Sequence, residues 1–369
     1  TVKDGFSGQV VVNTMNHRKE SFDTEYDAKA TLDAARHSTI HVQAVHPEDN
    51  VGTNLADELT PLNYYTILSD EEPASVYTNA NLRSFRITQP LQINMENDSL
   101  HMRFYSPVGI KEVTVMAKSP TMDEYVEFVY IDNIPAFADI KTSIKVLEKG
   151  LYRTESGKVL QFSAEEMNPA SLSLKIACND PYWTKISQIK AKWYIKFVLN
   201  GGNPVTGTPN KNWWGIRPVH CREAVALFLN IGYMCTLEKF QQRVSTFQGI
   251  FLDNNRYPVD TSTLISRLEN LSGFDIGLIY SGNGVSGLGG GRTWGVYQKS
   301  FLYHYENSGG CCSTIFHELG HCLGYSHNST MTYGQWASGC ADVFYKNNIK
   351  DFPVNSHTIL KSRSNPNIY

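Results

Sequence analysis

The chain has 369 residues, of which 41% are hydrophobic and 19% charged, and its formal net charge is −3. These values are typical of a globular protein with two domains of about 100–200 residues each. The sequence has no run of basic residues and no apolar stretch near the ~20 residues of a membrane span, so we expect no nucleic-acid binding and no transmembrane helix. We expect a monomer.

The seven cysteines are compatible with more than one cellular compartment. A disulfide from Cys340 to Cys311 or Cys312 would fix the C-terminal region, and free buried thiols are the alternative. Because the chain begins with Thr1 rather than Met, we interpret it as processed or truncated, and we expect a secreted or cell-surface protein.

Residues 1–70 carry weak structural signals. Residues 9–12 and 39–45 have the composition of short strands, and residues 23–37 that of a helix. Three histidines of this region are interpreted as ordinary surface residues rather than as a metal site: His37, His41 and His46.

Residues 71–185 alternate polar and apolar side chains in short runs, which predicts antiparallel strands with one face in water. The runs are residues 84–88, 91–95, 100–104, 110–115 and 159–162. Turn-forming sequences separate them, so we predict a β-sandwich. We therefore expect a β-rich N-terminal region at residues 1–185, in one part or in two (1–70 and 71–185). Its role is open between a spacer, a propeptide-like cover and a glycan-binding module.

Residues 186–369 alternate predicted strands with predicted helices, which indicates an α/β layer and an α+β fold class for the whole chain. Strands are predicted at residues 192–199, 275–280, 293–298 and 301–305. Helices are predicted at residues 221–231, 240–251, 264–271 and 339–349.

The most informative stretch is His317-Glu-Leu-Gly-His-Cys-Leu-Gly-Tyr-Ser-His327. Residues four apart share one face of a helix, so His317 and His321 can offer two imidazole nitrogens to one metal ion. Gly324 accepts the left-handed backbone that ends a helix, and the turned chain brings His327 back as a third ligand. Three protein ligands leave the fourth position to water, as catalytic zinc requires.

Glu318 follows the first ligand directly, which places it beside the metal, where it can take a proton from a metal-bound water. Ser313 or Thr314 is the predicted N-cap of this helix. Three histidines, a glutamate and a glycine at these offsets arise rarely by chance, so we predict a Zn²⁺ site with its own general base.

This pattern, H-E-x-x-H-x-x-G-x-x-H followed by a methionine, resembles the metzincin clan of zinc endopeptidases. The resemblance implies that residues 186–369 form a catalytic domain with a mixed sheet and a zinc helix, acting on protein or glycoprotein substrates. It is strong over residues 287–334, weak in the rest of the C-terminal half and absent from the N-terminal half. The two-part chain also resembles, in a general way, secreted bacterial metzincins, including those that attack mucin-type glycoproteins.

By the same resemblance, Met331 is the Met-turn residue beneath the zinc. Tyr333 corresponds to the tyrosine of the Met-x-Tyr turn in astacins and serralysins, which can ligate zinc and swing to stabilise the oxyanion. Met331 lies only four residues after His327, a short connection for the clan. A plain core methionine and a packed tyrosine are therefore the alternatives.

A glycine-rich segment at residues 281–292 precedes the zinc helix. It lacks the Gly-Lys-Ser/Thr of a phosphate-binding loop, so a flexible surface loop is the main alternative to a role at the site. The resemblance implies an edge strand that binds substrate main chain, and its expected residues are Gly287, Leu288, Gly289 and Gly290.

The sequence thus predicts a zinc-dependent endopeptidase in which Glu318 activates a zinc-bound water. Two other functions stay open. One is a zinc amidohydrolase that is not a peptidase. The other is a binding or adhesion protein that retains zinc and recognises glycans through residues 1–185.

Overall fold

The computed structural model describes residues 42–43, 61–144, 146–199, 201, 209–305 and 311–355. The strand predicted at residues 9–12, the predicted helix at residues 23–37 and the three N-terminal histidines lie outside these residues. The described chain is mixed α+β with several open sheets, which confirms the α+β class of the prediction. No described helix is both long and apolar enough to cross a membrane.

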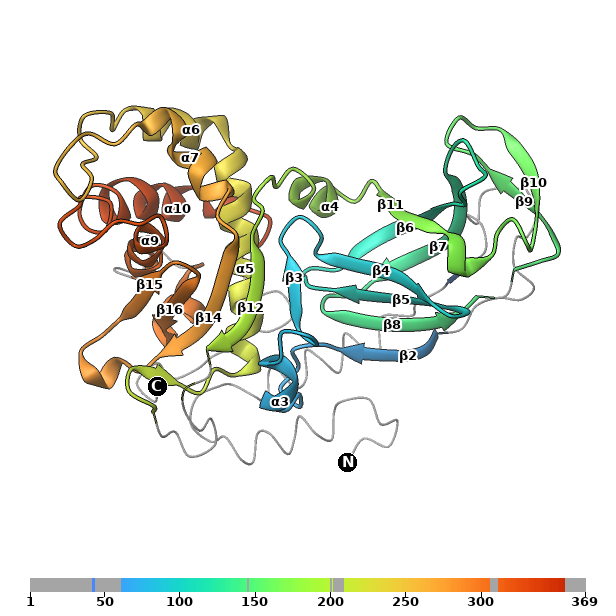
Figure 1. The fold of residues 1–369 in the computed structure, drawn as a ribbon, viewed down its shortest axis with the longest axis horizontal. Helices are drawn as coiled ribbons and strands as arrows, with labels where there is room; N and C mark the ends of the chain where they lie inside the picture. The colour runs from blue at the N-terminus through green and yellow to red at the C-terminus, as the bar shows by residue number, and fades with distance from the viewer. Residues whose placement is uncertain are drawn as a thin grey trace. The chain divides into compact units, whose positions relative to one another are not determined.

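The chain forms two compact units. The first contains residues 68–90 and the chain from residue 185 onward, and the second contains residues 91–184 with the described residues before 68. Each unit has its own sheets, coloured along the chain in Figure 1.

Two four-stranded antiparallel sheets share one hydrophobic core in the second unit. The first sheet has the order β1 (Val42–Gln43), β7 (Val126–Ile134), β6 (Ile110–Lys118), β11 (Ser173–Cys178). The second has the order β2 (Pro61–Thr66), β8 (Ala138–Ser143), β5 (Ser99–Phe104), β4 (Leu91–Glu96). The hairpin of β9 (Lys149–Arg153) and β10 (Val159–Ser163) completes the strands, and η1 (Pro169–Ser171) precedes β11.

The alternating pattern of the sequence decides which side chains enter this core. In β5, Leu100, Met102 and Phe104 are fully buried, whereas the residues between them are partly exposed. The inward side chains of β6 and β7 belong to the same buried cluster. Each sheet therefore has one face in the core, as period-two alternation requires.

A mixed sheet forms the centre of the first unit (Figure 1). Its order is β15 (Gly287–Gly290), β16 (Thr293–Tyr297), β14 (Gly273–Ile279), β12 (Tyr194–Leu199), β3 (Ser84–Arg86), and β13 (Trp213–Trp214) also pairs with β14. The strands β12, β14 and β16 are parallel, whereas both edge strands, β15 and β3, run antiparallel to their neighbours.

Helix α5 (Pro218–Thr236) is buried almost all round, which is typical of a central core helix. Its Phe228 ring lies 4.8 Å from Phe274 of β14 and 4.9 Å from Trp294 of β16. The other helices of this unit are α3 (Ala74–Tyr77), α6 (Glu238–Ser245), α7 (Thr261–Glu269), α8 (Gln298–Tyr303), α9 (Cys311–Cys322), the π-helix η3 (Ala337–Asp342) and α10 (Val343–Asn348). Short 3-10 turns follow at η2 (Ser281–Asn283) and η4 (Ile349–Asp351), and α4 (Pro181–Ile186) crosses the boundary of the units.

Two local predictions are wrong. The strand predicted at residues 301–305 is absent: residues 301–303 are helical and residues 304–305 form a turn. Phe301 and Leu302 are both buried and α8 packs against both α5 and α9, which period-two alternation cannot satisfy. The predicted N-caps Ser313 and Thr314 lie inside α9, which already includes Cys311.

Gly273 opens β14 in a conformation that demands glycine. Its φ is 135°, and an added Cβ would collide with the backbone of Tyr194 on β12. We therefore expect Gly273→Ala to destabilise the first unit by at least about 2 kcal/mol through strain and collision. Gly249→Ala is the matched control, since Gly249 has φ of 84° but no atom within 4 Å of the added Cβ.

Urea unfolding followed by tryptophan fluorescence measures this, because five of the six tryptophans lie in the first unit. The control is expected to lose only about 1 kcal/mol, the cost of the left-handed backbone alone. Equal losses for the two variants would contradict the close approach of the strands.

Candidate metal centre

Helix α9 turns its apolar side to the core and its histidines to a cleft. Its fully buried side chains follow the i, i+3, i+4, i+7 spacing of one helix face: Cys312, Ile315, Phe316 and Leu319. His317 and His321 lie one turn apart on another face. Gly324 has φ of 96° and ends the helical turn, as predicted.

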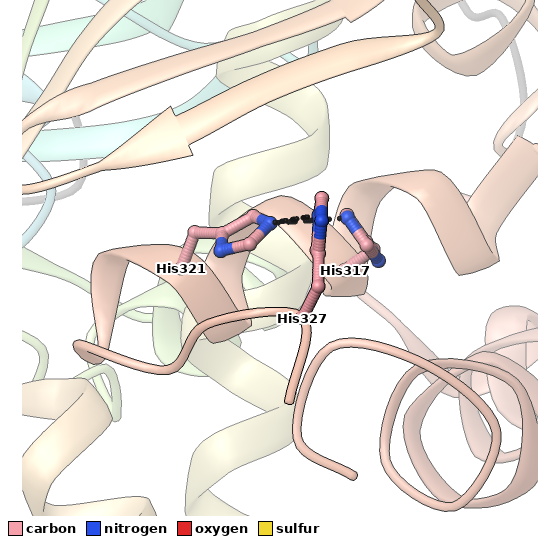
Figure 2. Close-up of side chains that lie close together, drawn as sticks. All are labelled: His317, His321 and His327. Carbon is pink, nitrogen blue, oxygen red and sulfur yellow. Dashed lines mark hydrogen bonds between the residues drawn. The ribbon is translucent and has the colours of Figure 1, made fainter. Parts of the chain in front are cut away.

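The three predicted ligands converge, two from α9 and one from the loop that follows it (Figure 2). The Nε2 atom of His321 lies 3.1 Å from that of His317 and 3.0 Å from that of His327. Among the described residues, these three are the one set of three or more His, Cys, Asp or Glu side chains close enough together to hold a metal ion.

The remaining ring nitrogens show which atoms carry protons. His317 Nδ1 faces the carbonyl oxygen of Thr332, and His321 Nδ1 lies 2.7 Å from that of Tyr325. A carbonyl only accepts hydrogen bonds, so each Nδ1 donates its proton and each Nε2 keeps a free lone pair. Facing lone pairs repel one another unless a cation lies between them. The donor set therefore fits a metal ion.

Two of the three separations between the ring nitrogens also fit zinc. Tetrahedral zinc–nitrogen bonds of about 2.0–2.1 Å place the ligand nitrogens about 3.3 Å apart. The observed separations of 3.0 and 3.1 Å are close to this value. Imidazoles that donate Nδ1–H to a carbonyl are the usual zinc-binding tautomer.

Burial shifts the pKa values of the titratable groups at the site. It lowers the pKa of His317 to about 4 and also lowers that of His321, so both rings are neutral at pH 7 and ready to bind a cation. Burial raises the pKa of Glu318 to about 8 when no metal is bound. The Glu318 carboxyl lies 3.9 Å from His317 Nε2, beside the ligand group rather than within it.

Strand β15 passes directly over Glu318. A Cβ on Gly287 would collide with the Glu318 carboxyl, and one on Gly289 would collide with the Glu318 carbonyl oxygen and lie 2.9 Å from Oε2. Both positions therefore require glycine while the carboxyl keeps its place. This is the physical reason for the glycine-rich segment, which the sequence alone left open.

The same strand exposes main-chain groups at the open edge of the sheet. Tyr297 N donates to Ser286 O at 2.9 Å, which sets the pairing of β15 with β16. Because hydrogen-bonded pairs alternate in an antiparallel ladder, Gly287 and Gly289 point their N–H and C=O groups away from β16. Gly287, Leu288 and Gly289 line a cleft of about 530 Å³ together with the three histidines and Glu318, whereas Gly290 is not part of the lining.

The segment after the third ligand packs closely on the other side of α9. Met331 is fully buried, and a Cβ on Gly320 would collide with its carbonyl oxygen. Trp336 Nε1 donates to Phe316 O at 3.0 Å, which ties the same segment to α9. Tyr333 lines the cleft, 55% exposed, with its ring 4.5 Å from that of His317.

The cysteines take no part in the ligand group. Cys340 is a buried thiol outside any disulfide, so of the two alternatives the bond from Cys340 to Cys311 or Cys312 is wrong. Cys322 is also a buried free thiol, and its Sγ lies 3.3 Å from Thr293 O of β16. These thiols fill the core around α9, and burial raises the pKa of Cys322 and of Cys340.

We expect Gly320→Ala to weaken zinc binding about tenfold or more. Helix propensity alone predicts that this change stabilises α9 by about 1 kcal/mol. The new methyl group instead pushes away the Met331 backbone and, with it, the Thr332 carbonyl that orients His317. Competition with a chromophoric chelator measures the affinity. An unchanged affinity in a more stable protein would contradict this packing.

Zinc binding at pH 7 is expected to release close to one proton more from the wild type than from Glu318→Gln. With a pKa of about 8, the metal-free Glu318 is mostly protonated, and a neighbouring cation lowers that pKa. His317 is already neutral and adds little. Calorimetry in buffers of different ionisation enthalpy counts the protons. The same count for both proteins would show that Glu318 does not sense the metal.

Comparison of the chain with protein-family models, with curated proteins and with solved structures found no match.

Proposed function

We propose that this protein is a zinc-dependent endopeptidase of the metzincin type. The observation that carries the proposal is the place of Glu318. Its buried carboxyl lies between a group of three histidines and an open strand edge. A metal site alone does not need a carboxyl that binds no metal. Hydrolysis of a bond held at the strand edge does need one.

Each residue then has a role. His317, His321 and His327 would hold a zinc ion, which when bound would supply Lewis-acid activation of water and of the scissile carbonyl. Glu318 accepts the proton of the attacking water and passes it to the leaving amine. The Tyr333 hydroxyl would donate a hydrogen bond to the developing oxyanion and keep its proton.

The strand edge supports an extended peptide as the substrate. Main-chain groups of Gly287 and Gly289 can pair with a peptide added alongside β15, and such pairing makes few demands on the substrate sequence. Cleavage of proteins or glycoproteins follows from this proposal. Secretion and glycan binding by residues 1–185 rest on the sequence alone and stay predictions.

The open edge also separates the proposal from its alternatives. A zinc amidohydrolase that takes single small molecules does not need main-chain donors along a strand. A binding protein that merely retains zinc does not need Glu318 buried beside the ligands. Both remain outcomes of the experiment that follows.

The test is cleavage of casein and of a mucin-type glycoprotein by the wild type and by Glu318→Gln, with zinc content measured for both. We expect the variant to keep its zinc and to lose about 10²-fold or more in kcat, because the proton acceptor is gone. Glu238→Gln, which changes an exposed carboxyl on α6, is the matched control and should cleave normally.

Two results would overturn the proposal. One is equal cleavage by the wild type and by Glu318→Gln. The other is wild-type protein that contains zinc but cleaves neither these substrates nor a library of unstructured peptides, which would favour a binding role.

A further inference from the structure

The third ligand differs from the other two in how it is held. His317 and His321 sit on a helix, and a carbonyl oxygen orients each ring. His327 is the most exposed of the three and lies in a loop without regular structure. Its Nδ1 makes no hydrogen bond with any described residue. The position of His327 must therefore be fixed through the backbone of its loop rather than through hydrogen bonds of its ring.

A small hairpin at residues 252–258 contacts the backbone on both sides of His327. Asn254 Oδ1 accepts from Ser326 N at 2.6 Å, and Asn254 Nδ2 donates to Gly324 O at 3.1 Å. Arg256 Nη1 donates to Asn328 O at 3.1 Å. One amide side chain thus binds the turn before the ligand, and a guanidinium binds the residue after it.

The same hairpin also pairs with the chain further along. Leu252 N donates to Thr330 Oγ1 at 2.8 Å, and Thr330 N donates back to Leu252 O at 3.1 Å. Ser329 Oγ donates to Leu252 O at 2.6 Å. The loop that carries His327 is therefore attached to the hairpin along most of its length.

The hairpin is built to keep its own shape. A bridge joins Leu252 to Pro258, and Asp253 N donates to Tyr257 O at 2.7 Å. The Asp253 carboxylate accepts from Asn255 N at 2.8 Å and from Tyr257 N at 2.9 Å. These bonds lie within residues 252–258, so the hairpin keeps its shape without the loop that carries His327. The hairpin can therefore act as a brace, a fixed support for that loop.

We propose that Asn254 is the positioning residue of the third metal ligand. It acts through Gly324 and Ser326, which set where His327 leaves the turn, and it touches neither metal nor substrate. The inference rests on the metal site of the proposed function, but it concerns metal binding and does not require peptidase activity.

The test measures the zinc affinity of the full chain by competition with a chromophoric chelator. We expect Asn254→Ala to weaken binding about 10–100-fold, the usual loss when a partner that orients a ligand is removed. Asn255→Ala is the matched control in the same hairpin, because the Asn255 side chain makes no hydrogen bond among the described residues. It should stay within about twofold of the wild type.

A double-mutant cycle separates positioning from a general loss of structure. If Asn254 acts through His327, adding Asn254→Ala to His327→Ala should change the remaining zinc affinity less than about twofold. Thermal unfolding of the metal-free Asn254→Ala protein should stay within a few degrees of the wild type, which excludes a collapsed site.

Three results would overturn the inference. Wild-type affinity in Asn254→Ala would show that the brace is not needed. An equal loss in the His327→Ala background would show that Asn254 acts elsewhere. A wild-type chain with no zinc affinity would remove the metal site itself, whereas zinc binding without cleavage would count against the proposed function alone.

Discussion

The site depends on how closely backbone can approach α9. Two segments approach α9 so closely that a side chain at the contact would collide. Strand β15 does so through its own Gly287 and Gly289, and the turn at Met331 does so against Gly320 of the helix. The first closes over the Glu318 carboxyl and shields it from water. The second brings a carbonyl oxygen to His317. Both the chemistry of the carboxyl and the orientation of a ligand follow from glycine at these positions.

The electrostatics follow from the same packing. Without a metal, the buried part of the site holds neutral His317 and His321 rings and a Glu318 carboxyl whose protonated form is favoured, so these three groups bury no net charge. A divalent cation reverses that preference, because the carboxylate then faces a positive charge. The protein therefore avoids the cost of an unpaired buried charge in either state. The charge of the Glu318 carboxyl and the binding of a cation therefore depend on each other, because both lie in the same space from which water is excluded.

The sequence predicted the local features of this site and few of the distant ones. The helical offset of His317 and His321, the turn at Gly324 and the place of Glu318 follow from backbone geometry within a few residues. The core strands followed from period-two alternation, as in β5. Helix α8 was mispredicted because Phe301 and Leu302 are buried on adjacent positions, a tertiary effect that no local pattern contains. Likewise, nothing near Ser84–Arg86 shows that this segment joins β12, more than a hundred residues away.

The hairpin around Asn254 has a consequence for how the protein is made. Two of the three candidate ligands lie within one helix, so this part of the site can form as soon as α9 does. The third is held by contacts that span 72 residues, such as the bond from Ser326 to Asn254. Contacts of long sequence separation form late, because closing the loop costs entropy before it is rewarded. The three-histidine group would therefore be complete only late in folding, and the proposed metal ion would meet two of its ligands before the third is in place.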